Sequence, residues 1–259
     1  MNRSVFRFLL ASVMLALALS AAATKSFDNE SLSYKVMYKW GLINKKAGTV
    51  TLTLKNSGDE YRTKLVAASE PWADKFYKVR DTLNGRILKK GFRPLFYEKI
   101  AHEGGDYKHD AVQFGYNDAG GTLEVSGKCI RREYKKGKMK RNERRELSAV
   151  GTTVDMLSAY YYMRSLPYEK WTAGHTETMT IFSGKRKEIL AIKYLGISDV
   201  EVDKKKTPAY HIVFIFTSDS GKKTSDNMDA WISADSRRIP LKLEGHLPVG
   251  KVQCYYTGQ

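Results

Sequence analysis

Alternation of apolar and polar residues is the feature that most restricts what this chain can fold into. Residues 32–40 carry Tyr34, Val36 and Tyr38 at every second position, and residues 49–54 alternate threonine with valine or leucine. A period of two places successive side chains on opposite faces of a β-sheet, so one face is buried and the other meets water. Similar runs occupy residues 61–68, 94–102, 107–116, 121–134, 139–150, 176–182, 188–196, 200–203, 210–217, 229–233, 239–245 and 249–256.

Short connections rich in Gly, Asn, Asp and Ser separate most of these runs, such as residues 56–59. Strands joined by short turns pair antiparallel, and so many strands in one sheet must curl, split or close. We therefore predict a mostly β protein, with an antiparallel curved sheet or an incomplete or closed β-barrel. The sequence contains no internal repeat and no long linker, so residues 24–259 are expected to form a single β-rich domain.

Two segments break the alternation and predict short helices. Residues 152–164 can be capped by Thr152 or Thr153, with Asp155 near the positive N-terminal end, and Pro167 ends the segment. Residues 71–77 begin with a proline and place Trp72 and Phe76 on one side of a helix. The apolar stripe of the longer segment consists of Val154, Leu157, Tyr160 and Tyr161.

The first 23 residues have the composition of a cleavable signal peptide. Arg3 and Arg7 precede an apolar run over residues 8–19, which is too short to span a bilayer as a helix, and alanines 21–23 suit a signal peptidase. No later segment is long and apolar enough for a transmembrane helix. We expect an exported, periplasmic protein that is not transmembrane after signal cleavage.

The mature chain is strongly basic. Removing Arg3 and Arg7 from the 44 Lys and Arg residues leaves 42 basic against 28 acidic residues, a net charge of +14. Export excludes nucleic acid as the expected partner, which leaves anionic envelope polymers, lipid headgroups or acidic glycans. A plain solubilising surface charge is the alternative.

The strongest charge feature lies in residues 131–145, where the turn at residues 135–138 predicts a protruding hairpin. Its cations either protect a sheet edge from aggregation or bind an anionic envelope surface. The candidate anion-binding residues are Arg131, Arg132, Lys135, Lys136, Lys138, Lys140 and Arg141.

Catalytic and metal-binding motifs are not evident. There is no G-x-S-x-G motif, and the two histidines within residues 102–110 are seven apart, which does not place two ligands on one helix face. Gly104 and Gly105 predict a two-residue hairpin turn there, and a metal or acid–base site formed by the two histidines and three acidic residues of this segment is the alternative. We predict no catalytic residue, no metal site and no cofactor. The charged neighbours of Cys129 predict that its side chain is exposed, and the apolar neighbours of Cys254 predict that its side chain is buried, which disfavours a disulfide between them.

Aromatic residues offer candidates for an apolar cavity. Tyr160 and Tyr161 on the longer helix, with Trp72 and Trp231, are the candidate ligand-binding residues. The alternative for each is packing in the core of the sheet.

Residues 231–245 predict a β-hairpin and also resemble the corresponding segment of a known protein family. Asp235 can accept backbone hydrogen bonds in a turn, and Ile239-Pro240-Leu241 starts the returning strand. This W-I-S-x-D-x-x-R-I-P pattern, with residues 34–43, Arg80-Asp81 and residues 155–161, resembles an uncharacterised family of exported proteins from Bacteroides-type bacteria, a domain of unknown function. That resemblance implies an antiparallel β protein of the envelope and brings no catalytic residues. A weaker, fold-level likeness is to periplasmic lipoprotein carriers, in which helices cover a cavity in an incomplete barrel.

Three functions follow from these observations. The favoured one is a non-enzymatic periplasmic protein that binds an apolar or amphipathic envelope molecule, such as a lipid or lipoprotein-like ligand, in a barrel-like cavity. The second is an envelope glycan hydrolase or lyase, for which the sequence places no carboxylate pair. The third is a basic scaffold whose hairpin binds a partner protein or anionic lipid.

Overall fold

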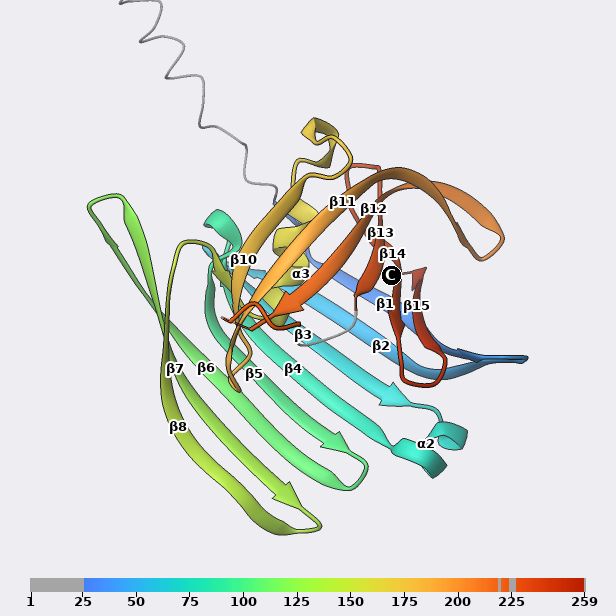
Figure 1. The fold of residues 1–259 in the computed structure, drawn as a ribbon, viewed down its shortest axis with the longest axis horizontal. Helices are drawn as coiled ribbons and strands as arrows, with labels where there is room; N and C mark the ends of the chain where they lie inside the picture. Colours follow the sequence, from blue (N-terminus) through green and yellow to red (C-terminus); the bar gives the residue numbers. More distant parts are fainter. Residues whose placement is uncertain (1–25, 219, 224–226, 259) are drawn as a thin grey trace, which may run out of the picture.

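The computed structural model describes residues 26–218, 220–223 and 227–258, which form one 15-stranded sheet (Figure 1). The first half of the sheet comprises β1 (Glu30–Trp40), β2 (Ile43–Ser57), β3 (Glu60–Ser69), β4 (Val79–Leu88), β5 (Pro94–Glu103), β6 (Asp106–Ala119), β7 (Thr122–Lys135) and β8 (Lys138–Val150). The second half comprises β9 (Thr153–Val154), β10 (Thr176–Phe182), β11 (Lys187–Val202), β12 (Lys205–Thr217), β13 (Met228–Ser233), β14 (Pro240–His246) and β15 (Lys251–Gly258). The helices are α2 (Pro71–Tyr77), α3 (Met156–Ser165), and the 3-10 turns η1 (Lys90–Phe92) and η2 (Tyr168–Lys170).

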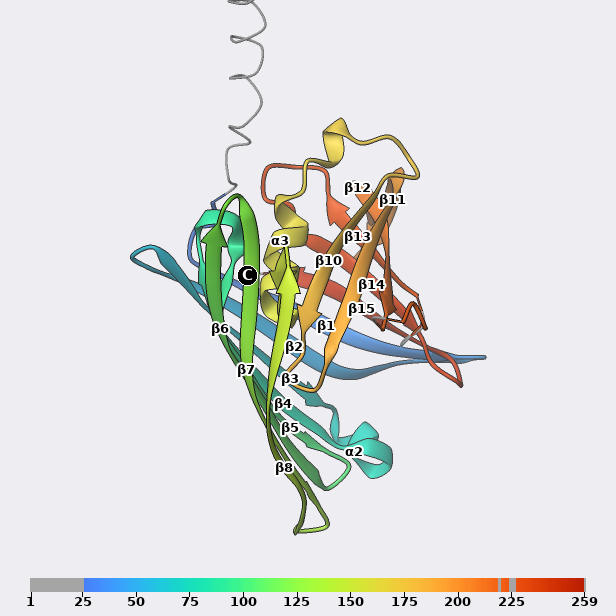
Figure 2. The ribbon, with the colours of Figure 1, turned by 60° about the vertical axis from the view of Figure 1, so that its left-hand side comes forward.

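The sheet follows the chain order in two meanders. Strands β1 to β8 pair successively, strands β9 to β15 pair successively, and β1 joins the two meanders by pairing with β15. Every ladder among the described residues is antiparallel except the short pairing of β9 with β10. The sheet curls around α3 (Figure 2), and its edge strands β8 and β9 are joined by residues 151 and 152 alone. The predicted mostly β, curved and barrel-like architecture with two short helices is confirmed.

Helix α3 lies inside the curled sheet (Figures 1 and 2). One apolar cluster joins α3 to β10–β13, and a second joins it to β2–β7. Gly85 on β4 allows the close approach on the second side, because a Cβ there would lie 3.2 Å from Leu157 Cδ1. The core is therefore built around a helix that both halves of the sheet contact.

The start of α3 differs from the prediction. Thr153 and Val154 form strand β9, and the N-cap is Asp155, whose carboxylate accepts hydrogen bonds from the backbone N–H of Leu157 (2.7 Å) and Ser158 (3.0 Å). Ser158 Oγ accepts in return from the Asp155 N–H, which completes a capping box. The threonine caps were wrong because Asp155 satisfies two backbone donors and leaves the preceding residues free to pair with β10. The helix ends before Pro167 as expected.

Three further features of the structure differ from what the sequence predicted. Strand β4 was not predicted, because its run mixes Asn84, Gly85 and Arg86 with the apolar residues. Residues 188–196 and 200–203 belong to one strand, β11, with an irregularity in register at Tyr194–Gly196. Cys129 is buried rather than exposed, because the charged residues on its side of β7 also face the interior. Both cysteines are free, and burial raises the pKa of each thiol to about 11.

Candidate functional site

An apolar pocket lies between α3 and the inner faces of strands β10 to β14. Its volume is about 130 Å³. Helix α3 contributes Met156 at its first turn, and Met156 is 42% exposed, so the pocket opens to solvent there. The lining residues are Met156, Ala159, Tyr160, Met163, Ile181, Leu190, Phe214, Phe216, Met228 and Leu243. Three of these ten residues are methionines, whose flexible side chains can adapt their shape to a bound ligand.

Tyr160 is the candidate from the sequence that lines this pocket. Its hydroxyl forms a hydrogen bond with the Tyr34 hydroxyl at 2.8 Å. Burial raises the Tyr160 pKa to about 12, although the charge of Arg164 opposes the shift. The ring therefore presents a neutral wall to the pocket at physiological pH.

The other three aromatic candidates lie elsewhere. Tyr161 is fully buried in the cluster on the opposite side of α3, and its hydroxyl has no hydrogen-bond partner among the described residues. Trp231 is on the outer face of β13, stacked on His211 with ring centroids 4.4 Å apart. Trp72 is on α2, where its Nε1 donates to the Lys46 carbonyl at 2.6 Å. The structure does not bring the four aromatic residues together around one cavity.

A buried arginine holds α3 against both halves of the sheet. The Arg164 side chain is 1% exposed and forms a two-pronged ion pair with the Glu30 carboxylate of β1. It also donates from Nε to the Arg238 carbonyl (2.9 Å) and from Nη2 to the Arg237 carbonyl (3.0 Å), while its guanidinium lies 4.3 Å from the Phe27 ring centroid. This role of Arg164 was not predicted, since an arginine in the last turn of a helix is usually solvent-exposed.

The turn between β13 and β14 presents those two carbonyls. Asp235 Oδ1 accepts hydrogen bonds from the backbone N–H groups of Arg237 (3.0 Å) and Arg238 (3.2 Å). Arg238 adopts a φ of +53° and directs its side chain over the Tyr210 ring at 4.6 Å. The predicted turn is confirmed, and its structural task is to receive Arg164.

The inner face of the sheet changes from apolar to charged towards the α2 end. Lys99 Nζ lies 3.4 Å from Asp81 Oδ2 and 3.2 Å from Glu103 Oε1, and Lys108 Nζ lies 2.9 Å from Glu103 Oε2. Burial raises the pKa of Asp81 against the charge of Lys99. Burial also acts to raise the Glu103 pKa, but Lys108 and Lys99 outweigh it and lower the value to about 2. The pairing of these two carboxylates was not predicted, because Asp81 lies on strand β4, which was itself not predicted.

The hairpin of β7 and β8 divides the predicted anion-binding residues into two groups. Arg131 faces inward, 3.6 Å from Asp110 and 3.7 Å from Glu133, and Arg141 pairs with Glu133 and Glu143. Lys135 is exposed and lies 3.8 Å from Glu133. The remaining four predicted residues are exposed and make no ion pair with any residue that the structure describes. These four are Arg132, Lys136, Lys138 and Lys140.

The segment over residues 102–110 is the β5–β6 hairpin, with Gly104 and Gly105 at positive φ in its turn as predicted. Within the described ranges, no group of three or more metal-ligating side chains comes together. Of the helices described, none combines the length and hydropathy that a bilayer crossing requires. The predicted signal peptide lies outside the described residues.

A nearly closed β-sheet wrapped around one buried helix, with a small apolar pocket beside the helix, defines the class: a barrel-like β protein. Residues 33–257 match the family model described as "Protein of unknown function (DUF3108)". The chain therefore belongs to the DUF3108 family, which confirms the resemblance to a domain of unknown function. No curated protein sequence matches it.

A solved structure shares the fold. The crystal structure of a beta-barrel-like protein of the domain of unknown function DUF1849 from Brucella abortus matches with a TM-score of 0.56 and 9% sequence identity. The match covers 89% of this chain and 96% of the other. At that identity the likeness concerns the fold alone.

Proposed function

We propose that this protein is exported to the periplasm and binds, without catalysis, the apolar part of an amphipathic envelope molecule in the pocket beside α3. The supporting observation is the pocket itself, whose wall is formed by methionine, aliphatic and aromatic side chains and opens at Met156. Burial of an apolar group in such a wall contributes about 0.8 kcal/mol per methylene.

The volume limits what enters. Small-molecule sites usually measure roughly 300–1,000 Å³, and this pocket measures about 130 Å³. The ligand therefore inserts a short alkyl or branched end, and the remainder of a lipid or lipoprotein-like molecule stays outside. Movement of Met156, Met163 or Met228 would lengthen the space for a longer chain.

Binding is tested with the mature chain, residues 24–259, and straight-chain fatty acids of increasing length. Affinity should rise about fourfold per methylene and then level off once the pocket is full. Met156→Trp should block the entrance and weaken binding, whereas the matched control Met139→Trp, an exposed methionine on the hairpin, should not. Equal binding by both variants, or no dependence on chain length, would contradict the proposal. Sequencing the N-terminus of protein recovered from the periplasm tests export.

A glycan hydrolase or lyase is the second candidate. The observation in its favour is that Asp81 and Glu103 share Lys99 while their pKa values move in opposite directions, as in an acid–base pair. Incubation with acidic envelope glycans should then release reducing ends, and Asp81→Asn should abolish the release. If the wild-type protein releases none, this candidate fails.

Binding of an anionic lipid surface or partner by the hairpin is the third candidate. It rests on the four exposed and unpaired cations named above. Vesicles with anionic headgroups should bind more tightly than neutral ones, and the difference should fall as salt rises. Replacement of all four cations by glutamine should remove that difference; salt-independent binding would exclude the hairpin.

A further inference from the structure

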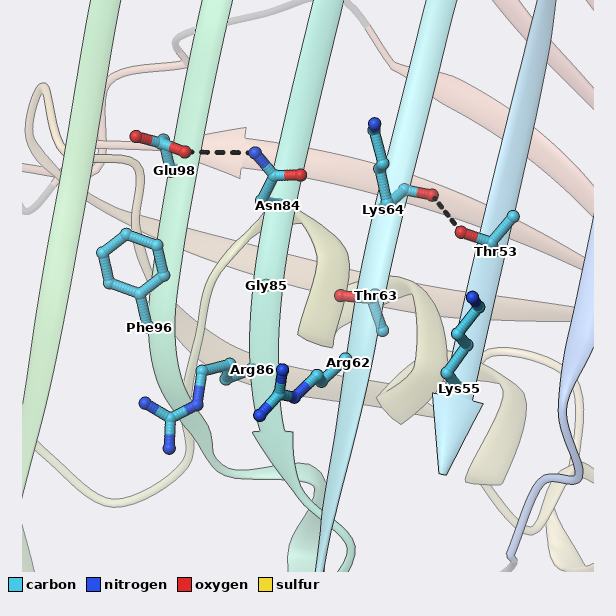
Figure 3. A pocket seen from close by; sticks show the side chains of 10 residues that line it. All are labelled: Thr53, Lys55, Arg62, Thr63, Lys64, Asn84, Gly85, Arg86, Phe96 and Glu98. Atoms are coloured by element: carbon cyan, nitrogen blue, oxygen red, sulfur yellow. Dashed lines mark hydrogen bonds between the residues drawn. The ribbon is translucent and has the colours of Figure 1, made fainter. Parts of the chain in front are cut away.

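A second hollow lies on the outer face of the sheet, over strands β2 to β5. Its volume is about 820 Å³, within the usual range of small-molecule sites. Figure 3 shows it with α3 behind the strands, on the other side of the sheet. The hollow is thus separate from the apolar pocket. Its lining residues are Thr53, Lys55, Arg62, Thr63, Lys64, Asn84, Gly85, Arg86, Phe96 and Glu98.

Cations are crowded on one side of this hollow. Lys55, Arg62 and Arg86 stand opposite one another in register on three adjacent strands. Like charges directly across a sheet repel, so this row destabilises the free protein. In Figure 3 the Arg62 side chain extends from β3 towards Arg86 on β4.

Acidic partners balance only part of this charge. Glu60 accepts two hydrogen bonds from Arg86, from Nε at 2.9 Å and from Nη2 at 2.8 Å. Lys55, Arg62 and Lys64 make no ion pair within the described part of the chain. Three exposed cations are therefore available to an anion, and the guanidinium fork of Arg62 matches the geometry of a phosphate.

The opposite side of the hollow has a different chemistry. Asn84 Nδ2 donates to Glu98 Oε2 at 3.1 Å, and His109 Nε2 lies 2.8 Å from Glu98 Oε1. This carboxylate can accept hydrogen bonds from hydroxyl groups and would repel a second anionic group. The partly exposed Phe96 ring beside it offers an apolar face.

We propose that this hollow binds a phosphorylated sugar or polyol ring, with the phosphate at Lys55, Arg62 and Lys64 and the ring hydroxyls at Glu98. The charge distribution requires an anion at one end of the ligand and hydrogen-bond donors at the other. A volume well above that of a phosphate alone accommodates the ring against Phe96.

The same chemistry occurs in a free sugar phosphate and in a lipid headgroup. The two sources are separated by titrating the mature chain with soluble inositol 1-phosphate and, in a second arm, with phosphatidylinositol in phosphatidylcholine vesicles. Inositol and inorganic phosphate serve as the partial ligands, all at one ionic strength. Binding of the soluble ester alone assigns a free ligand, and binding of the vesicles assigns a headgroup.

Variants decide whether the hollow is the site. Arg62→Gln with Lys64→Gln should weaken binding of inositol 1-phosphate about tenfold or more. The matched control, Lys205→Gln with Lys206→Gln, removes equal charge from two exposed residues at the start of β12 and should leave binding unchanged. Glu98→Gln should reduce the preference for inositol 1-phosphate over inorganic phosphate.

Each contrary result has a clear meaning. Absence of binding by wild type in both arms, or equal weakening by the Lys205 and Lys206 control, overturns the proposal. Inorganic phosphate binding as tightly as inositol 1-phosphate overturns the assignment of the ring. The unfolding temperature of Arg62→Gln with Lys64→Gln should be no lower than that of wild type, because both side chains are exposed and the substitution removes the repulsion between Arg62 and its neighbours Lys55 and Arg86.

Discussion

Replacing Arg164 by methionine tests whether the buried ion pair joins α3 to both halves of the sheet. The substitution keeps the length and apolar contacts of the side chain but leaves the Glu30 carboxylate, 9% exposed, without its partner. Breaking a buried pair in this way costs about 3–5 kcal/mol. The carbonyls of Arg237 and Arg238 also lose their donors, so the upper part of that range is expected.

Urea unfolding followed by tryptophan fluorescence measures this loss. With a slope of about 1–3 kcal/mol per molar urea, the midpoint should fall by about 1 M or more. Arg237→Met is the matched control: its carbonyl remains and its side chain is 62% exposed, so stability should change by less than about 0.5 kcal/mol.

A double-mutant cycle isolates the pair. In a Glu30→Gln background Arg164→Met no longer leaves a carboxylate unpaired and also removes the guanidinium that has lost its partner, so it should cost at least about 2 kcal/mol less than in wild type. Strict additivity, or a loss below about 1 kcal/mol for Arg164→Met alone, would refute the reasoning.

Three further predictions concern α3. Burial raises the Asp155 pKa from 3.8 to about 6, so the native state holds an extra proton between these two pH values and its stability falls as pH rises through them. Asp155→Asn keeps the cap and has no carboxyl group to titrate. In parallel urea titrations, the stability of this variant relative to wild type should therefore increase by up to about 3 kcal/mol between pH 4 and pH 7. Tyr161→Phe should be neutral or stabilising in thermal unfolding because it removes an unpaired buried hydroxyl, whereas Tyr160→Phe should cost about 1 kcal/mol by breaking the bond to Tyr34; the reverse order would be inconsistent with the structure. Gly85→Ala should lower the free energy of unfolding by about 1–3 kcal/mol, since the added Cβ would lie 2.6 Å from Thr63 Oγ1 and 3.2 Å from Leu157 Cδ1. An unchanged urea midpoint would show that α3 has room to move.

Local patterns predicted elements well where pairing and burial repeat regularly. The alternation in residues 49–54, the Gly104-Gly105 turn and the proline-started helix at Pro71–Tyr77 all depend on contacts between near neighbours in the chain. Strand β4 failed because its interior face includes Gly85, whose small size serves a helix more than seventy residues away.

The candidate sites were less accessible to sequence. Tyr160 was identified because it belongs to an apolar stripe, yet the same stripe placed Tyr161 beside it. Only Tyr160 also packs against the cluster of strands β10–β13 and lines the pocket. The outer hollow was missed because Lys55, Arg62 and Arg86 are spread over three strands and meet only through register.

The sequence by itself determined the β class, the turn at Gly104 and Gly105 and the hairpin of β7 and β8, because a period of two and turn residues act over a few positions. Only the tertiary structure decided that Arg164 is buried, that Asp81 and Glu103 share Lys99, and that a pocket lies beside α3. Each of these depends on how far the sheet curls and on which strands meet across it. Curvature and long-range register arise from packing of the whole chain, and no local run of residues encodes them.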